Sequence, residues 1–141
     1  MVSELEGAPV DLSRRVGSAS VSLAFVGLAA VDLILKFVGF RRLYQTVKRW
    51  PVHERGTNKP QAIASVCAAV DRAGTYYPKQ ALCLQRSAVV TCLLRMKGVD
   101  AQMVIGCRKA PFRGHAWVEV DGIPVNDDLE MQNLYTVLTR C

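Results

Sequence analysis

The longest apolar run in the second half of the chain lies between Cys83 and Met96. Its leucine, alanine, valine and cysteine side chains fall on nearly every side of a helical wheel. A helix that is apolar nearly all round belongs in the centre of a domain, where other elements cover it from several directions. The pattern therefore predicts a buried central helix that begins at Cys83 and ends before Gly98, with Cys92 in the core.

Three short runs after this helix have the pattern of β-strands. Residues 101–107 and 115–120 alternate apolar with polar positions, and the loop between them is rich in breakers and positive charge. Asp121 and Gly122 separate the second run from residues 123–127, and Asp-Gly between such runs favours a type I′ turn. These features predict a small antiparallel sheet whose third strand ends at an acid.

The register of this hairpin leaves the partner of His115 open. In a flat two-residue hairpin centred on the Asp-Gly turn, His115 faces Asp128, and Asp127 points to the other side of the sheet. A single bulge after Val125 would bring Asp127 to His115 instead. Spacing alone does not decide between the two acids.

An amphipathic helix is predicted between Pro60 and Gly74. Proline suits the first turn of a helix, and four later side chains recur at helical spacing as one buried stripe. We expect Gly74 to end the helix. The stripe consists of Ile63, Val66, Cys67 and Val70.

Residues 21–40 are largely apolar over a length that suits a membrane span of about 20 residues. Asp32 and Lys36 lie four residues apart and can pair on one helix face, which favours a packed helix hairpin or a helix on a membrane surface. The following basic residues suit either a solvated helix face or peripheral contact with anionic lipid. They are Arg41, Arg42, Lys48 and Arg49.

The length of 141 residues is enough for one domain with a real core and too short for two ordinary ones. No hydrophobic periodicity occurs in residues 1–13, which we expect to form a loose arm. A polar loop that contains His53 precedes Lys59. Only a weak helical pattern occurs in residues 129–140. We therefore expect an N-terminal arm and helical region over 1–59, with possible partner docking, and a core region over 60–141. Together they form one compact α+β domain.

Charge and composition narrow the function only slightly. Half of the residues are apolar and 21% are charged, which excludes wholesale disorder. The formal net charge of +6 favours acidic partners such as a peptide, a nucleic acid or a lipid surface. No base-reading motif occurs, and aromatic residues are not interleaved with basic ones, so we expect no nucleic-acid partner.

Cysteine usage predicts a reducing, cytoplasmic setting. The five cysteines include no CxxC pair, no secretory signal opens the chain, and a disulfide framework is unusual in a domain of this size. Cys83, Cys92, Cys107 and His115 lack the paired spacing of a zinc site. We therefore expect neither a metal nor another cofactor.

Cys83 and His115 have the residue types of a nucleophile and its base. A thiol attacks a carbonyl usefully only as the thiolate, and a free thiol with a pKa of about 8.5 carries little of that form at neutral pH. The positive end of a helix that begins at Cys83 favours the anion, and a nearby imidazolium favours it further. An acid behind the imidazole would fix its tautomer.

The position of His115 on its strand agrees with this role. It lies on the same strand face as Trp117 and Glu119, opposite the apolar Ala116 and Val118, and therefore outside the face that we expect to meet the core. The alternative is that Cys83 is a buried cysteine and His115 a hydrogen-bonded histidine, and that both have only structural roles.

Four sequence blocks resemble those of a known protein family and occur in the order and at the spacing found in that family. They are CLQRS at 83–87, GVDA at 98–101, VIG at 104–106 and HAWVEVDGIPVND at 115–127. The chain resembles the stand-alone leader peptidases of lasso peptide biosynthesis, which belong to the transglutaminase-like, papain-related superfamily of cysteine proteases. The resemblance implies a nucleophile-bearing helix packed on a small antiparallel sheet.

The resemblance also implies residue roles and partners. Cys83 is then the nucleophile, His115 the base and Asp127 the orienting acid. The substrate is a ribosomally made precursor peptide, which a small leader-recognition protein grips and an ATP-dependent cyclase then closes into a macrolactam. Gln80 is a candidate oxyanion donor, and Arg86 and Trp117 are candidates for substrate contact.

Two other functions fit the same residues. A transglutaminase-like acyltransferase would resolve the thioester with an amine instead of water. A non-catalytic scaffold would hold a precursor or a membrane complex through its basic helices. Product masses and a Cys83→Ala variant separate these readings.

Overall fold

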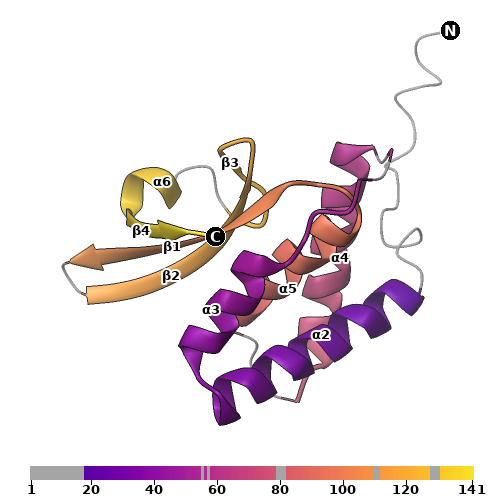
Figure 1. Cartoon of the computed structure of the whole chain (residues 1–141), viewed down its shortest axis with the longest axis horizontal. Helices are drawn as coiled ribbons and strands as arrows, with labels where there is room; N and C mark the ends of the chain where they lie inside the picture. The colour runs from indigo at the N-terminus through magenta and orange to yellow at the C-terminus, as the bar shows by residue number, and fades with distance from the viewer. Residues whose placement is uncertain (1–17, 55, 57, 79–81, 110–111, 128–130) are drawn as a thin grey trace, which may run out of the picture.

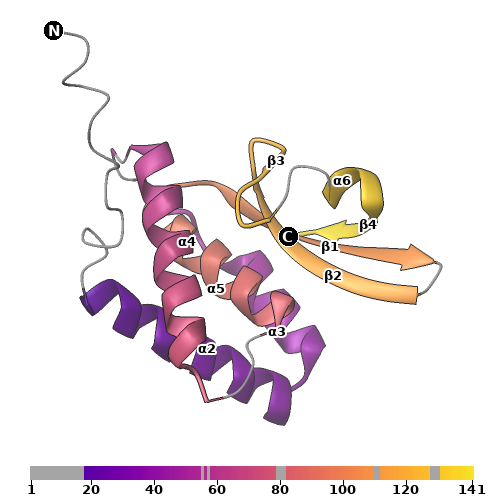
Figure 2. The same cartoon turned by 180° about the vertical axis from the view of Figure 1, so that it is seen from behind.

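Helix α5 (Cys83–Met96) lies between a β-sheet and three other helices, as Figure 1 and the reverse view in Figure 2 show. The computed structural model describes residues 18–54, 56, 58–78, 82–109, 112–127 and 131–141. Most side chains of α5 are buried, in agreement with its nearly uniform apolar surface. The sequence-predicted central helix and the α+β class are confirmed.

Four antiparallel strands form one sheet in the order β3-β2-β1-β4. Asp121 and Gly122 have φ angles of 53° and 79°, as the predicted type I′ turn requires. The third strand is shorter than predicted because it ends at Pro124 rather than at Asp127. The strands are β1 (Ala101–Lys109), β2 (Phe112–Val120), β3 (Ile123–Pro124) and β4 (Thr136–Arg140).

Strand β4 is the largest departure from the sequence prediction. The weak helical pattern of the tail gives only the short α6 (Met131–Leu134), and the chain then pairs with β1 as a strand. Cys141 continues this pairing, since its backbone N–H donates to Met103 at 2.9 Å and its carbonyl accepts from Met103 at 2.7 Å. The C-terminal segment thus closes one edge of the sheet.

Helix α4 (Lys59–Tyr76) begins as predicted and ends later than predicted. The Asn58 side chain caps it by accepting from the Gln61 backbone N–H, and Pro60 lies in its first turn. Gly74 lies inside the helix and is buried. A Cβ atom there would lie 3.0 Å from Arg86 Nη2, so glycine allows the arginine to cross the helix closely.

Helices α2 (Ser18–Phe37) and α3 (Phe40–Arg49) occupy the outer layer. Gly39 separates them with a φ of 93°, a conformation that favours glycine. The segment Ser20–Phe37 is long and apolar enough to cross a membrane by length and composition. In the structure α2 instead packs one face on α4 and α5.

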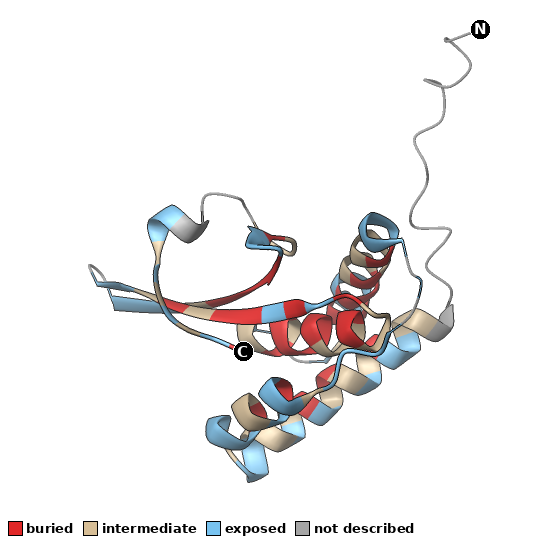
Figure 3. Ribbon diagram, turned by 45° about the horizontal axis from the view of Figure 1, so that its top comes forward, coloured by how far each residue is buried: buried red, intermediate tan, exposed pale blue. Residues whose placement is uncertain are grey.

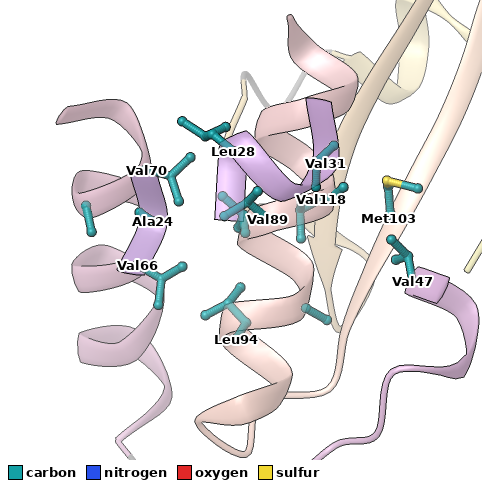
Figure 4. Close-up of a cluster of buried hydrophobic side chains, with 14 of the residues drawn as sticks. Ala24, Leu28, Val31, Val47, Val66, Val70, Val89, Leu94, Met103 and Val118 are labelled. Carbon is teal, nitrogen blue, oxygen red and sulfur yellow. The ribbon is translucent and has the colours of Figure 1, made fainter. Parts of the chain in front are cut away.

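One hydrophobic core joins helices α2 to α5 with strands β1 and β2. Figure 3 shows the buried residues concentrated on α5, on the facing side of α4 and along the central strands. Arg95 adds hydrogen bonds within this buried region, because its guanidinium donates to the backbone carbonyls of Val47, Trp50 and Ala101. Figure 4 labels core members from the helices and the sheet: Ala24, Leu28, Val31, Val47, Val66, Val70, Val89, Leu94, Met103 and Val118.

Candidate active site

Cys83 is the first residue of α5, and a set of hydrogen bonds fixes the start of this helix. The Leu82 backbone N–H donates to Gln85 Oε1 at 2.7 Å, and Gln85 Nε2 donates to Asp32 Oδ1 at 3.0 Å. The first backbone N–H groups of a helix lack intrahelical acceptors and carry partial positive charge. The partly buried Cys83 side chain therefore lies at the positive end of the helix.

His115 lies on β2 and forms a hydrogen bond with Asp127. The Nε2 and Oδ2 atoms are 2.5 Å apart, and the two side chains are 22% and 25% exposed. Because the carboxylate occupies Nε2, the other ring nitrogen, Nδ1, is the one available to a thiol. This pairing orients the ring in the manner that a base requires.

The chain reaches this geometry by leaving the β-ladder early. After Pro124 the Val125 backbone N–H still donates to the Val118 carbonyl, but residues 125–127 form a bend in place of further strand. The bend carries Asp127 to His115, where a flat hairpin would point it to the other side. Asp128, the alternative acid, lies outside the described residues, as does Gln80.

Cys83, His115 and Asp127 line one cleft of about 230 Å³. Its floor includes apolar side chains of α4 and α5, and most of the remaining lining is polar. The structure thus brings together the three side chains on which the sequence prediction depends. The polar lining consists of Cys67, Asp71, Cys83, Arg86, Ser87, His115, Asn126 and Asp127.

Cys67 is a second thiol in this cleft, and its environment makes it a poor nucleophile. Burial raises the pKa of Cys67 to about 11, and the nearby Asp71 carboxylate adds to the shift. Its Sγ donates to the Val125 carbonyl at 3.6 Å. Of the two cysteines that line the described cleft, Cys83 is therefore the candidate nucleophile.

Ser87 and Asn126 tie together the three segments that carry these groups. Ser87 Oγ, one helical turn after Cys83, donates to the Ala116 carbonyl at 3.1 Å and accepts from Asn126 Nδ2 at 3.2 Å. Asn126 Oδ1 accepts from the Val118 backbone N–H at 2.7 Å. The network fixes the start of α5, the strand that carries His115 and the bend that carries the acid.

Trp117 supports His115 from behind. The two rings stack with centroids 6.0 Å apart, and Tyr135 lies 5.3 Å from the His115 ring. Trp117 Nε1 donates to Glu119 Oε1 at 2.9 Å, and both residues are almost wholly buried. This strand face lies outside the main hydrophobic core, as expected, since that core contains Val118 and Val120 from the opposite face; it is nevertheless buried, because Tyr135 and the C-terminal segment cover it.

Burial also changes the role of Trp117. Its ring is 0% exposed, so it has no surface to offer a substrate and is a positioning residue for His115. Gly106 makes room for it, since a Cβ atom there would lie 2.9 Å from the indole ring.

Arg86 remains at the wall of the cleft. Its Nη1 lies 3.7 Å from Asp71 Oδ1, both side chains keep substantial exposure, and its Nε has no hydrogen-bond partner among the described residues. The guanidinium lies against Gly74. This position of Arg86 allows both contact with a substrate and support of the start of α5.

Sequence reasoning missed Ser87, Asn126 and Tyr135. The first two lie inside the blocks that carry the family resemblance, so their position was the available signal. Tyr135 follows a weakly patterned tail and gave no signal, because its contact depends on how the tail folds over β2.

Comparison with known proteins agrees with this architecture. A sequence model of the transglutaminase-like superfamily matches residues 26–140. The microcin J25-processing protein McjB of Escherichia coli is 39% identical over 58 residues, which cover 41% of this chain and 28% of McjB. The chain thus matches less than a third of that relative's length, and no solved structure matches it. Since the matched residues run from within α2 to the end of β4 and include Cys83, His115 and Asp127, the chain belongs to the transglutaminase-like superfamily.

Proposed function

We propose that this protein is a cysteine peptidase that removes the leader from a lasso precursor peptide. The observation that carries the proposal is the His115–Asp127 hydrogen bond in the same cleft as Cys83 at the start of α5. Membership of the superfamily and similarity to a protein named for processing microcin J25 support it.

In the first half of the proposed reaction, His115 Nδ1 takes the proton of the Cys83 thiol. The thiolate attacks the carbonyl carbon of the scissile peptide bond, and the negative charge moves to the carbonyl oxygen. The Cys83 backbone N–H, at the free end of the helix, is the donor that this chain offers to that oxygen. The imidazolium then protonates the leaving amine, which departs and leaves a thioester.

In the second half, a water molecule attacks the thioester. His115 takes a proton from the water and returns it to the sulfur as the acyl group leaves as a carboxylic acid. Asp127 holds the imidazole throughout and stabilises its positive charge. Trp117 and Tyr135 limit rotation of the ring through their stacking contacts.

The setting of the reaction follows from its chemistry. A free thiol nucleophile needs a reducing compartment, so the proposed location is the cytoplasm. The proposed partners are the precursor, a small leader-recognition protein and an ATP-dependent cyclase that uses the freed amine. The cleft of about 230 Å³ holds only a few residues of a peptide, so a separate recognition protein would supply the remaining affinity.

The test is to incubate the purified protein with the precursor encoded beside it, with and without the recognition protein, and to weigh the products. Hydrolysis adds the mass of one water across the cut bond. Cys83→Ala and His115→Ala should each abolish cleavage while the protein remains folded. Cys107→Ala is the matched control, because Cys107 lies on β1 and is not part of the cleft.

Two results would overturn the proposal. A product joined to an added amine in place of water would indicate an acyltransferase. Processing at the wild-type rate by Cys83→Ala would indicate a scaffold that acts through its surface.

A further inference from the structure

The turn between α2 and α3 exposes large apolar side chains. Phe37, Val38 and Phe40 are 73%, 56% and 47% exposed, and they follow one another around Gly39. We call residues 36–42 the α2–α3 tip; it forms the lower edge of the molecule in Figure 1. Three such residues at one turn make an apolar patch that water solvates poorly.

Cations flank this patch on both sides. Lys36 precedes it, Arg41 and Arg42 follow it, and all three residues are exposed. No Asp or Glu occurs between residues 36 and 49. The closest preceding acid, Asp32, is directed inward, where it accepts from Gln85 and Tyr77.

The patch continues along the outer face of α2. Leu23, Val26 and Leu33 are 49%, 62% and 54% exposed. With Ala30 and Phe37 they recur at intervals of three and four residues, so they form one stripe along the helix. The opposite face, with Ala24, Leu28 and Val31, is buried in the core.

This division of α2 into two apolar faces excludes a spanning arrangement for the folded protein. To cross a bilayer, α2 would have to leave α4 and α5, expose their core and abandon the hydrogen bond between Asp32 and Gln85. A helix that keeps one face in the protein can place only its other face in the boundary between headgroups and acyl chains.

We propose that the α2–α3 tip and the outer stripe of α2 dock this protein on an anionic lipid bilayer. The exposed phenylalanines and Val38 enter the boundary region, and Lys36, Arg41 and Arg42 bind lipid phosphates. Surface charge attraction and buried apolar area are the two terms that hold peripheral proteins to such membranes.

The charges at the tip favour a lipid bilayer over a second copy of the chain or another protein as the partner of this surface. A second copy of the chain would bring the same cations face to face at the tip. Leu23, Val26 and Ala30 of the stripe also line an apolar groove between α2, α3 and α5, and no charged residue takes part in that lining, so the groove offers no charge complementarity to a protein partner. The cations lie at the tip, where a phosphate-rich surface meets them.

The test measures cosedimentation with phosphatidylcholine vesicles that contain or lack phosphatidylglycerol, at low and high salt. Wild-type protein should bind the anionic vesicles, and binding should weaken with salt. Arg41→Gln with Arg42→Gln should weaken it by about fivefold for each cation. Phe37→Ser with Phe40→Ser should reduce it by at least about tenfold, since two aromatic rings leave the boundary region.

The hairpin end between β1 and β2 provides a matched control. Phe112 is 79% exposed and neighbours Arg108, Lys109 and Arg113, so it has a similar local composition without an apolar stripe behind it. Phe112→Ser with Arg113→Gln should leave vesicle binding unchanged. All variants should keep the wild-type circular dichroism spectrum and the wild-type peptide cleavage rate in solution.

Three outcomes would overturn the proposal. Failure of the folded wild-type protein to bind anionic vesicles is the first. Loss of binding in the Phe112 variant with retention in the Phe37 variant would assign the contact to the other tip. A wild-type dimer that Phe37→Ser with Phe40→Ser converts to a monomer would show that a second copy covers this face.

Discussion

Asn126→Ala tests whether the bend that carries Asp127 is held by the side chain before it. Asn126 Oδ1 accepts from the Val118 backbone N–H at 2.7 Å, and its Nδ2 donates to Ser87 Oγ at 3.2 Å. Alanine removes both bonds and leaves a buried strand N–H without its acceptor, which costs about 1–3 kcal/mol. With the second bond, at about 1 kcal/mol, we expect a loss of about 2–4 kcal/mol in unfolding free energy.

The same change should lower catalysis more than binding. A fold with about 5–15 kcal/mol of stability survives this loss, so the variant can be assayed in its native state. Freed from Ser87 and Val118, the bend no longer fixes the acid behind the imidazole. A misplacement of about 1 Å can cost about 100-fold in rate, so we expect kcat to fall by about 10- to 100-fold. KM should change by less than about threefold, because Asn126 acts through its effect on the position of Asp127.

Asn58→Ala is the matched control for this experiment. Asn58 caps α4 and accepts from the Gln61 backbone N–H, so its loss should cost about 1 kcal/mol of stability without a change in kcat. Urea unfolding gives the stability of both variants, and steady-state cleavage of the precursor gives their kinetics. Wild-type kcat in a destabilised Asn126→Ala variant would refute the reasoning, because it would make the network purely structural.

Four further tests probe the cleft and the residues behind it. Asp127→Ala removes a charged hydrogen bond and should lower the cleavage rate by about 10- to 150-fold. Asp127→Asn keeps an oxygen acceptor for the imidazole and should retain more activity. Equal cleavage rates for the two variants would contradict this. At pH 8, iodoacetamide should label Cys83 before Cys67, whose pKa of about 11 leaves about one thousandth as thiolate; peptide mapping checks this. Because that pKa is raised above 9.0, the stability from the buried Cys67 thiol is complete below pH 9 and is lost as pH rises through 11, which urea midpoints should follow. Gly106→Ala should cost about 1–3 kcal/mol and reduce kcat, since the added methyl displaces Trp117; unchanged melting would contradict the crowding.

The parts of the fold that the sequence predicted well are those that local pattern decides. The helix from Cys83 to Met96 follows from an apolar surface nearly all round and a glycine after its end. The β2–β3 turn follows from Asp121 and Gly122, whose positive φ values suit few other residue pairs. In both cases the determining residues are neighbours in the sequence.

The errors arise where a distant segment decides the outcome. Gly74 reads as a helix end, but it lies within α4, where the absence of a Cβ makes room for the Arg86 side chain. The tail reads as a weak helix, but Thr136–Arg140 becomes a strand because the edge of β1 offers unpaired backbone groups. Trp117 lies outside the main core, as its strand position predicts, but the sequence gives no sign of its full burial, which depends on the folded tail.

The pairing of His115 is an intermediate case. The hairpin turn sets the register of Glu119 with Pro124, and a flat continuation would place Asp128 opposite the histidine. The ladder ends at Pro124, and the Asn126 side chain supplies the acceptor that the next strand residue would otherwise offer to Val118. Local spacing cannot reveal that a side chain replaces the backbone acceptor here, because the position of Asn126 depends on Ser87 in helix α5.

Helix α2 connects the proposed lipid contact with the start of α5. Its outer stripe is the proposed lipid contact, and its inner face carries Asp32, which holds Gln85 and through it the Leu82 backbone N–H at the start of α5. The sequence offers Lys36 as the natural partner of Asp32, and the structure directs the carboxylate to the nucleophile's helix. An aspartate is costly on a helix that crosses a bilayer, and it is useful on one that lies along a surface with its inner face in the protein. The position of Asp32 therefore argues for a helix that stays packed on α5 and does not cross a bilayer, which leaves only its exposed side for the proposed lipid contact.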